Sequence, residues 1–306
     1  MPNFSFLRRM IFDGRGGPTA PAHRPNPAGW RDDAITGSCL GHSTVLMNVL
    51  GARVLTDPVF SLRAGPGLAT MVLGPKRYLL PALELNEFAA PEVLVLSHAH
   101  FDHFDTWSLK KFSRDTPVVT AKATRDLLRR FRTVHELAWG ESVDLSIKGR
   151  TLRVEAIPVA HWGARMMRDT DRGYNGYVLE RDGRAVCFAG DTAYTNVFEN
   201  LRKRERPLDL ALFPIGAYDP WIRAHCTPEQ AVAMAEQAGA KYFVPIHHQT
   251  FKLSSEPMDE PAARLRKLFA REPRRLLAVD VGETFRVPLL EPVERTGLHS
   301  RATVNG

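Results

Sequence analysis

The sequence has few cysteines and no long apolar run. Cys39, Cys187 and Cys226 are its only cysteines, they stand far apart, and they form no C-x-x-C pair. This pattern argues against a disulfide framework and favours a reducing compartment. No apolar segment approaches the roughly 18 residues that cross a bilayer, and residues 1–9 lack the apolar core of a signal peptide. We therefore expect a soluble cytoplasmic protein.

The chain has no long block of residues of one charge. The formal net charge is +7, which favours approach to anionic partners such as phosphate esters and acidic lipid surfaces. Because the arginines are scattered, a solvated surface explains most of them, and no nucleic-acid partner is expected. Residues 4–12 combine apolar side chains with two arginines, so a peripheral membrane contact stays open beside docking on the protein's own domain. Oligomer formation also stays open.

Low complexity and internal repeats are absent, and the composition is that of a globular protein. Hydrophobic residues make up 44% and charged residues 25% of the chain, enough to bury a sizeable core. Glycine and proline are frequent in residues 13–34, which predicts a flexible or wrapping lead-in over residues 1–33. We expect one catalytic domain over residues 34–289 and a C-terminal tail over residues 290–306.

Strand and helix signals alternate within the expected domain. Residues 92–97 form a nearly continuous apolar run, typical of a strand covered on both faces. Further strands are predicted over 44–50, 53–56, 117–120, 151–159, 174–180, 185–189, 208–214 and 242–246. Helices are predicted over 107–113, 124–131, 195–204, 228–238 and 261–269. This alternation indicates a layered α/β sandwich.

Four residues with metal-binding side chains lie within six positions directly after the strand at 92–97. They are His98, His100, Asp102 and His103. Side chains alternate in an extended segment, so His98 and His100 can bind one ion, and the following turn lets Asp102 and His103 reach a second position. Imidazole and carboxylate ligands suit zinc, with manganese or iron as alternatives. Two divalent ions are therefore expected here.

Three more such residues follow predicted strands elsewhere. His161, Asp191 and His247 stand where the strands at 151–159, 185–189 and 242–246 end, and strand ends are where α/β folds place their sites. A lone histidine is more often a surface or core residue, but four potential ligands in six positions make that interpretation improbable. The sequence thus indicates one site assembled from four strand ends.

These residues and the phrases around them carry a family resemblance. The ordered set His-x-His-x-Asp-His, then His161, Asp191 and His247, resembles the metallo-β-lactamase superfamily. Within this superfamily, several sequence segments are similar to the branch of phospholipases D that hydrolyse N-acylphosphatidylethanolamine. The related branch of ascorbate-phosphate lactonases shares fewer of them. The segments are Leu40-Gly-His42-Ser-Thr-Val, Leu55-Thr-Asp57-Pro-Val-Phe-Ser, Gly74-Pro-Lys-Arg77, Phe188-Ala-Gly-Asp191-Thr and Pro214-Ile-Gly-Ala-Tyr218. The match covers about residues 34–288.

The resemblance implies a fold, a ligand set and a reaction. The fold would be a four-layer αβ/βα sandwich with a dinuclear metal site between two sheets. One ion would be held by His98, His100, His161 and Asp191, and the other by Asp102, His103, Asp191 and His247. Asp191 would bridge the ions, a bridging hydroxide would be the nucleophile, and Asp102 would orient that hydroxide.

Three residues have candidate roles around the metals. Asp57 would hold the far nitrogen of a ligand histidine, or it is a turn residue before Pro58. His42 lies near the metals, or it serves the turn after Gly41. His225 resembles a family histidine near the substrate phosphate, which implies a general acid or a phosphate contact, with loop solvation as the alternative.

Two departures from the phospholipase pattern bear on the substrate. His248 and Gln249 stand where that branch has an aromatic residue and a glycine, which also leaves His248 as an alternative ligand. Residues 162–174, with Arg165 and Met166, differ as well and are expected in the pocket wall. The leading hypothesis is a zinc-dependent phosphodiesterase acting on a phospholipid; the alternatives are a lactone or carboxylic-ester hydrolase and a non-catalytic metal-binding protein.

Overall fold

The structure is a computed structural model that describes residues 17–68, 71–166 and 169–289. The N-terminal segment expected to contact a membrane or its own domain and the tail expected over residues 290–306 lie outside the described residues. Residues 17–33 lie against the domain, because Thr19 pairs with Leu79 and the side chains of Pro25 and Pro27 are buried.

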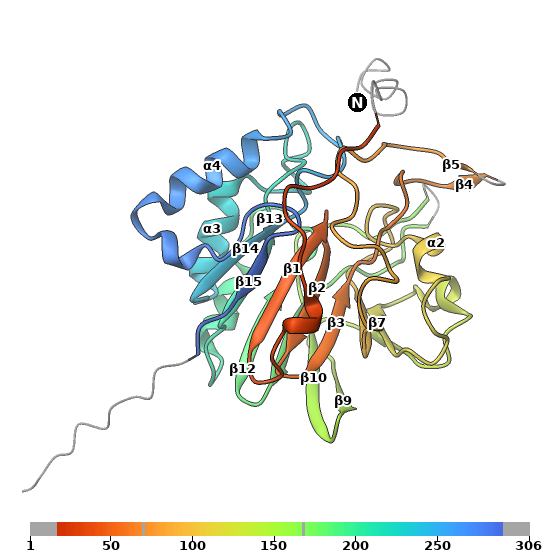
Figure 1. The fold of residues 1–306 in the computed structure, drawn as a ribbon, viewed down its shortest axis with the longest axis horizontal. Coiled ribbons are helices and arrows are strands. Elements are labelled where there is room, and N and C mark those ends of the chain that lie inside the picture. The colour runs from red at the N-terminus through yellow and green to blue at the C-terminus, as the bar shows by residue number, and fades with distance from the viewer. Residues whose placement is uncertain (1–16, 69–70, 167–168, 290–306) are drawn as a thin grey trace, which may run out of the picture.

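Two mixed β-sheets face one another (Figure 1). Among the described residues, one sheet has the strand order β15-β1-β2-β3-β6-β7-β8 and the other β14-β13-β12-β11-β10-β9. The strands of the first sheet are β1 (Ile35–Gly41), β2 (Thr44–Val49), β3 (Ala52–Thr56), β6 (Val93–Leu96), β7 (Val118–Ala121), β8 (Val134–Leu137) and β15 (Thr284–Arg286). Those of the second are β9 (Ser142–Ile147), β10 (Arg150–Ile157), β11 (Gly176–Arg181), β12 (Arg184–Phe188), β13 (Leu210–Pro214) and β14 (Tyr242–Ile246). A small hairpin joins β4 (Gly67–Leu68) to β5 (Met71–Val72).

Each sheet combines antiparallel hairpins with a parallel half. Strands β1, β2 and β3 are antiparallel neighbours, whereas β3, β6, β7 and β8 run parallel. In the second sheet β12, β13 and β14 run parallel. The carboxyl ends of parallel strands open at one edge of a sheet, and ligand sites of α/β proteins form at such edges.

The main core lies between the sheets. Apolar residues such as Val54, Val95, Leu152 and Phe188 are fully buried there. Helices α3 (Pro228–Gln237) and α4 (Glu260–Leu268) cover the outer face of the second sheet. Helix α2 (Thr106–Leu109) and the loops around it cover the first sheet. The expected αβ/βα sandwich is confirmed.

Helix α3 begins with a capping box. The Oγ1 atom of Thr227 accepts a hydrogen bond from the backbone N–H of Gln230, while the side chain of Gln230 accepts one from the backbone N–H of Thr227. Pro228 occupies the first turn, where a missing N–H costs nothing. The loop that carries His225 is therefore fixed at its carboxyl end.

Several predicted helices are shorter than expected or are 3₁₀ helices. Helix α2 has four residues, and the segments Arg125–Leu128 and Val197–Lys203 are 3₁₀ helices. The connection from β7 to β8 contains the 3₁₀ helix Arg125–Leu128. Strands β1, β8, β9 and β15 were not predicted, because their sequences carry polar residues or are short. No helix formed by the described residues is long and apolar enough to span a bilayer.

Candidate metal centre

The seven predicted ligands converge at one edge of the sandwich. His98 to His103 follow β6, His161 follows β10, Asp191 follows β12 and His247 follows β14. Four overlapping groups have their ligand atoms within 4.8 Å of one another: His98, His100 and His161; His98, His103 and Asp191; His42, Asp102, His103 and His247; and His161, Asp191 and His225. The tertiary structure therefore brings together four loops that are distant in sequence.

Three histidines form one side of the cluster. The Nε2 atom of His98 lies 2.8 Å from Nδ1 of His100, and Nε2 of His161 lies 3.3 Å from that same Nδ1. Three ring nitrogens from two loops thus face a common point. This is the arrangement of imidazole ligands around a small cation.

The carboxylate of Asp191 lies between the two sides of the cluster. Its Oδ2 atom is 3.1 Å from Nε2 of His103, 3.1 Å from Nε2 of His247 and 3.8 Å from Nε2 of His161. Nδ1 of His225 lies 3.7 Å from the same oxygen. Asp191 follows Gly190, where a Cβ atom would lie 2.7 Å from Cβ of Ser97 and φ is +60°. Glycine at this position therefore allows the close approach of the two loops.

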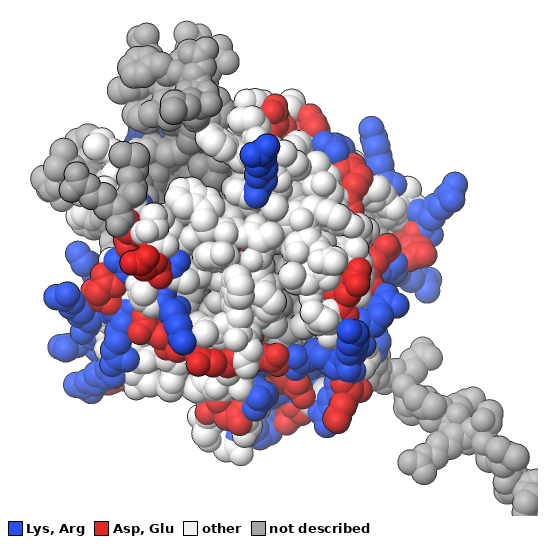
Figure 2. Space-filling view, turned by 180° about the vertical axis from the view of Figure 1, so that it is seen from behind, with Lys and Arg blue, Asp and Glu red and all other residues white. Residues whose placement is uncertain are grey.

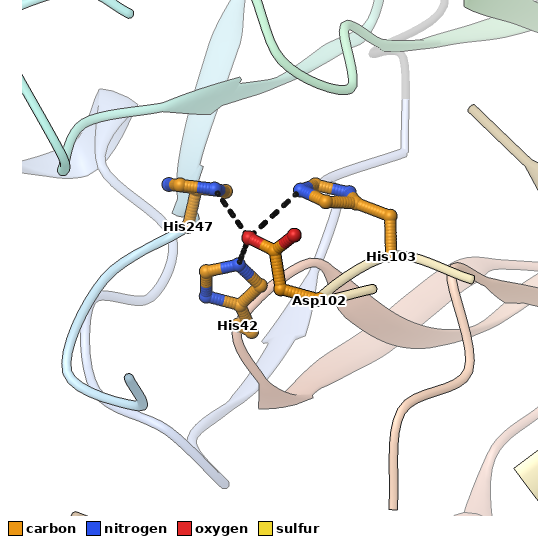
Figure 3. A group of neighbouring side chains, drawn as sticks. All are labelled: His42, Asp102, His103 and His247. Atoms are coloured by element: carbon orange, nitrogen blue, oxygen red, sulfur yellow. Dashed lines mark hydrogen bonds and ion pairs between the residues drawn. The ribbon is translucent and has the colours of Figure 1, made fainter. Parts of the chain in front are cut away.

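Asp102 forms the other side with three imidazoles around one oxygen. Figure 3 shows His42, His103 and His247 directed toward Oδ2 of Asp102. The distances from that oxygen are 3.0 Å to Nε2 of His42, 3.5 Å to Nε2 of His247 and 3.7 Å to Nε2 of His103. A carboxylate and several imidazoles at this spacing are a suitable ligand set for a divalent ion.

Outer hydrogen bonds fix the protonation of three histidines. Nδ1 of His161 donates to the carbonyl of Ala224 over 2.8 Å, and Nδ1 of His103 donates to Oδ2 of Asp57 over 2.7 Å. The hydroxyl of Ser97 donates to Asp57 and lies 2.9 Å from Nδ1 of His98. When Nδ1 carries the proton, Nε2 keeps its lone pair for a cation.

The backbone adopts the left-handed region at three residues of the centre. The φ angles are +57° at His42, +33° at Asp57 and +61° at His247. Non-glycine residues rarely adopt positive φ, and such positions cluster at functional sites because the surrounding structure has to stabilise them. Backbone hydrogen bonds do so here: His247 N–H donates to the carbonyl of His42, and His42 N–H donates to Oγ1 of Thr250.

Burial and mutual charge shift the pKa values of the cluster strongly. Burial, together with neighbouring imidazoles, lowers the pKa of His100 to about 3 and holds that of His98 well below its usual range. For His103 burial acts in the same direction, but the negative charges of Asp191 and Asp102 outweigh it and hold the pKa well above its usual value. The pKa of Asp191 lies well below its usual range, because the cations of His103 and His247 outweigh its burial. The centre therefore stabilises positive charge between its carboxylates.

Unsatisfied buried atoms test whether a metal fits this set. Buried side-chain atoms that make no hydrogen bond within the described residues include Nε2 of His103, Nε2 of His247 and Oδ1 of Asp191. Nε2 of His103 lies 3.1 Å from Asp191 but without the alignment of a hydrogen bond. Leaving such atoms unpaired costs about 1–3 kcal/mol each. Divalent cations would satisfy them together, so these residues fit a metal centre.

The candidate residues around the ligands all lie at the centre. Asp57 contacts His103, His42 contacts Asp102, and His225 lies beside Asp191. His247 belongs to the cluster. His248 is buried but is in none of the four groups that the described residues form.

Sequence analysis did not single out Ser97, Thr250 or the contacts of Arg165. Ser97 stands directly before His98, so its place in the same phrase was the available signal. No sequence pattern pointed to Thr250.

Comparisons with known proteins bear on the family of the chain. Residues 52–248 match the family model described as the beta-lactamase superfamily domain. The chain is 31% identical over 286 residues to N-acyl-phosphatidylethanolamine-hydrolyzing phospholipase D 1 of Caenorhabditis elegans, covering 87% of this chain and 80% of the relative. It is also 31% identical over 245 residues to the mitochondrial N-acyl-phosphatidylethanolamine-hydrolyzing phospholipase D of Saccharomyces cerevisiae, covering 76% of this chain and 52% of that protein.

A solved structure of a metallo hydrolase has a similar fold. A metallo hydrolase from Ignicoccus hospitalis superposes with a TM-score of 0.62 at 20% identity, covering 84% of this chain and all of that chain. The family match, the fold and the convergence of the histidine and aspartate side chains together lead to one conclusion. The chain belongs to the beta-lactamase superfamily, among its metal-dependent hydrolases.

Proposed function

We propose that this protein is a metal-dependent phosphodiesterase that hydrolyses a phospholipid. Two divalent ions, zinc in preference to manganese or iron, would be held in two positions that share Asp191. The first position would consist of His98, His100, His161 and Asp191, and the second of Asp102, His103, His247 and Asp191. The observation that carries the proposal is the single oxygen of Asp191 within 3.1–3.8 Å of imidazoles from both positions.

The residues of the centre have different roles in the proposed hydrolysis. Bound divalent ions supply a water of lowered pKa and stabilise negative charge that develops on the phosphate. The carboxylate of Asp102 is hydrogen-bonded to His42, and Asp102 would orient the attacking water. His225 lies beside Asp191, where it can contact the phosphate or give a proton to the leaving alcohol.

Exposed apolar side chains beside the centre favour a lipid substrate. Trp162 is 54% exposed and its ring centroid lies 4.4 Å from that of His100. Ile222 is 43% exposed and belongs to the loop in which Ala224 contacts His161. Apolar surface at a polar site fits a substrate with acyl chains, and aromatic side chains suit a membrane interface.

The charge distribution also favours contact with a lipid surface. Figure 2 shows one face whose middle carries few charged side chains, while lysine, arginine, aspartate and glutamate gather along its margins. Uncharged surface bordered by lysine and arginine suits a peripheral contact with an anionic lipid surface. The names of the worm and yeast relatives point to N-acylphosphatidylethanolamine as the first substrate to test.

A substrate comparison tests this function. Purified protein loaded with zinc is assayed with N-acylphosphatidylethanolamine in mixed micelles, bis(4-nitrophenyl) phosphate and a panel of lactones, with the metal content measured by elemental analysis. We expect about two zinc ions per chain and cleavage of the phospholipid, with ¹⁸O from labelled water in the phosphatidate. Lactone turnover without phosphodiester turnover would instead support the carboxylic-ester alternative, and a metal-loaded protein without any turnover would support the non-catalytic one.

A further inference from the structure

Arg165 connects the loop that follows β10 to the metal-binding turn after β6. Its Nη1 atom donates hydrogen bonds to the carbonyl of Ala99 over 2.8 Å and to the carbonyl of Phe104 over 2.8 Å. Ala99 lies between His98 and His100, and Phe104 directly follows the turn; both are fully buried. One guanidinium thus binds both ends of the segment that carries the turn's ligands.

Aromatic rings complete the environment of this guanidinium. Its central carbon lies 4.0 Å from the ring centroid of Phe101 and 5.6 Å from that of Phe104. Within the described ranges, no carboxylate forms an ion pair with Arg165, so carbonyl oxygens and aromatic faces are its main partners. A planar guanidinium can stack on a ring and donate in its own plane at the same time, which an ammonium cannot do.

The loop of Arg165 is itself anchored at its other end. Arg172 forms ion pairs with Asp126 and Asp169. The two arms of the loop also approach closely, since a Cβ atom on Gly163 would lie 2.2 Å from the carbonyl oxygen of Arg172. Arg165 therefore lies two residues after this close approach at Gly163 and four residues after His161.

The proposed ligands in the turn differ in the side-chain contacts that fix their orientation. His103 is held by Asp57 and Asp102 by His42, each through a side-chain hydrogen bond. Nε2 of His100 makes no hydrogen bond within the described residues, and its ring instead lies against Trp162, which belongs to the loop of Arg165. The three-histidine side of the centre thus depends most on the placement of the two loops relative to one another.

We propose that Arg165 is a positioning residue that fixes the metal-binding turn against the loop of His161, and so preorganises the three-histidine metal position. The inference rests on the proposed metal binding. It assigns to Arg165 no contact with substrate or metal. Its consequence is that loss of the guanidinium weakens binding at the position of His98, His100 and His161 more than at the position of Asp102, His103 and His247.

Zinc affinity measured in two steps tests the inference. Metal-free wild type, Arg165→Met, Arg165→Lys and the control Arg153→Met are titrated with Zn²⁺ against chromogenic chelators. Arg153→Met also removes one arginine, but Arg153 lies on β10, where its ion-pair partner is Asp144. We expect Arg165→Met to weaken one of the two zinc steps about 10–100-fold, the range for residues that orient ligands. Arg165→Lys should recover part of this loss, and Arg153→Met should change either step less than about threefold.

Co²⁺ provides a second readout that does not depend on activity. The visible absorption of the Co²⁺-loaded protein reports ligand geometry, and we expect it to change in Arg165→Met and to stay as in wild type in Arg153→Met. Near-ultraviolet circular dichroism of the metal-free proteins checks that each is folded; if Arg165→Met does not fold, Arg165→Lys carries the test with a smaller loss. Wild-type zinc affinity at both steps in Arg165→Met, or an equal loss in Arg153→Met, overturns this inference alone. A wild type that binds no zinc overturns the proposed function as well.

Discussion

His42 and Asp102 are joined by a hydrogen bond of 3.0 Å between Nε2 and Oδ2, although 60 positions separate them in the sequence. The ring centroid of His42 also lies 4.0 Å from that of His247, and its carbonyl accepts the backbone N–H of His247. His42 thus contacts two proposed ligands of the same metal position.

Replacing His42 should therefore impair catalysis through Asp102. We expect His42→Phe to lower kcat/KM for bis(4-nitrophenyl) phosphate about 10–100-fold at saturating zinc, as for other residues that orient ligands. His42→Gln should lose less, since the amide nitrogen of glutamine reaches about as far as Nε2 of histidine and can donate to Asp102. The exposed His23→Ala serves as the control. Equal activity of His42→Phe and wild type would show that Asp102 needs no such support.

Asp57 should control zinc affinity through His103. Its carboxylate accepts hydrogen bonds from the Ser97 backbone, from the Ser97 hydroxyl and from Nδ1 of His103. In Asp57→Asn, an amide group has to replace one acceptor oxygen, which leaves either Ser97 or His103 facing a donor. We expect a 10–100-fold loss of zinc affinity, measured by chelator competition. Ser97→Ala, which keeps the carboxylate, should lose less; the opposite order would contradict this role for Asp57.

The role of His225 can be separated from metal binding by the choice of leaving group. If His225 protonates the leaving alcohol, His225→Gln should slow phospholipid hydrolysis about 10²–10⁴-fold, the usual contribution of general acids and bases. Hydrolysis of bis(4-nitrophenyl) phosphate should change far less, because 4-nitrophenolate leaves without a proton. Zinc content should stay as in wild type. Similar losses for both substrates would instead indicate that His225 contacts the phosphate.

Trp162 should matter for lipid substrates and little for a soluble diester. We expect Trp162→Ala to raise KM for N-acylphosphatidylethanolamine in mixed micelles about tenfold, because burying a large apolar side chain contributes about 1.5 kcal/mol or more. The KM for bis(4-nitrophenyl) phosphate should stay close to that of wild type. Leu268→Ala on α4, also an exposed apolar residue, is the control. Parallel increases for both substrates would mean that Trp162 acts by supporting His100.

The three cysteines should be unreactive in the folded protein. Burial raises the pKa of Cys39 to about 11 and that of Cys187 to about 12, and it raises the pKa of Cys226 further. Because the thiolate is the reactive form, almost none is present at pH 8, and buried sulfurs are also shielded from reagents. Ellman's reagent should detect no thiol in the native protein and three after denaturation. A fast-reacting thiol in the native state would be incompatible with this burial.

Many strands could be predicted from the local sequence because they are strongly apolar. The strands predicted at 92–97 and 185–189 are β6 and β12 of the structure. Strand β1 was not predicted because it contains Thr36, Gly37 and Ser38. These residues are buried because β1 pairs with β2 and β15. The helix predicted over 195–204 is a 3₁₀ helix at Val197–Lys203, a distinction that composition alone does not make.

The sequence by itself determined which side chains could bind metal, because His98, His100, Asp102 and His103 follow one buried strand and the remaining candidates also stand at strand ends. Only the tertiary structure decided how they meet: Asp191 lies between imidazoles from three loops, His42 contacts Asp102, and Arg165 binds the turn. These contacts join residues far apart in the chain, and they depend on strand order and on positive backbone φ angles. A local pattern contains the ligands, whereas the hydrogen bonds that orient them arise from the packing of separate loops.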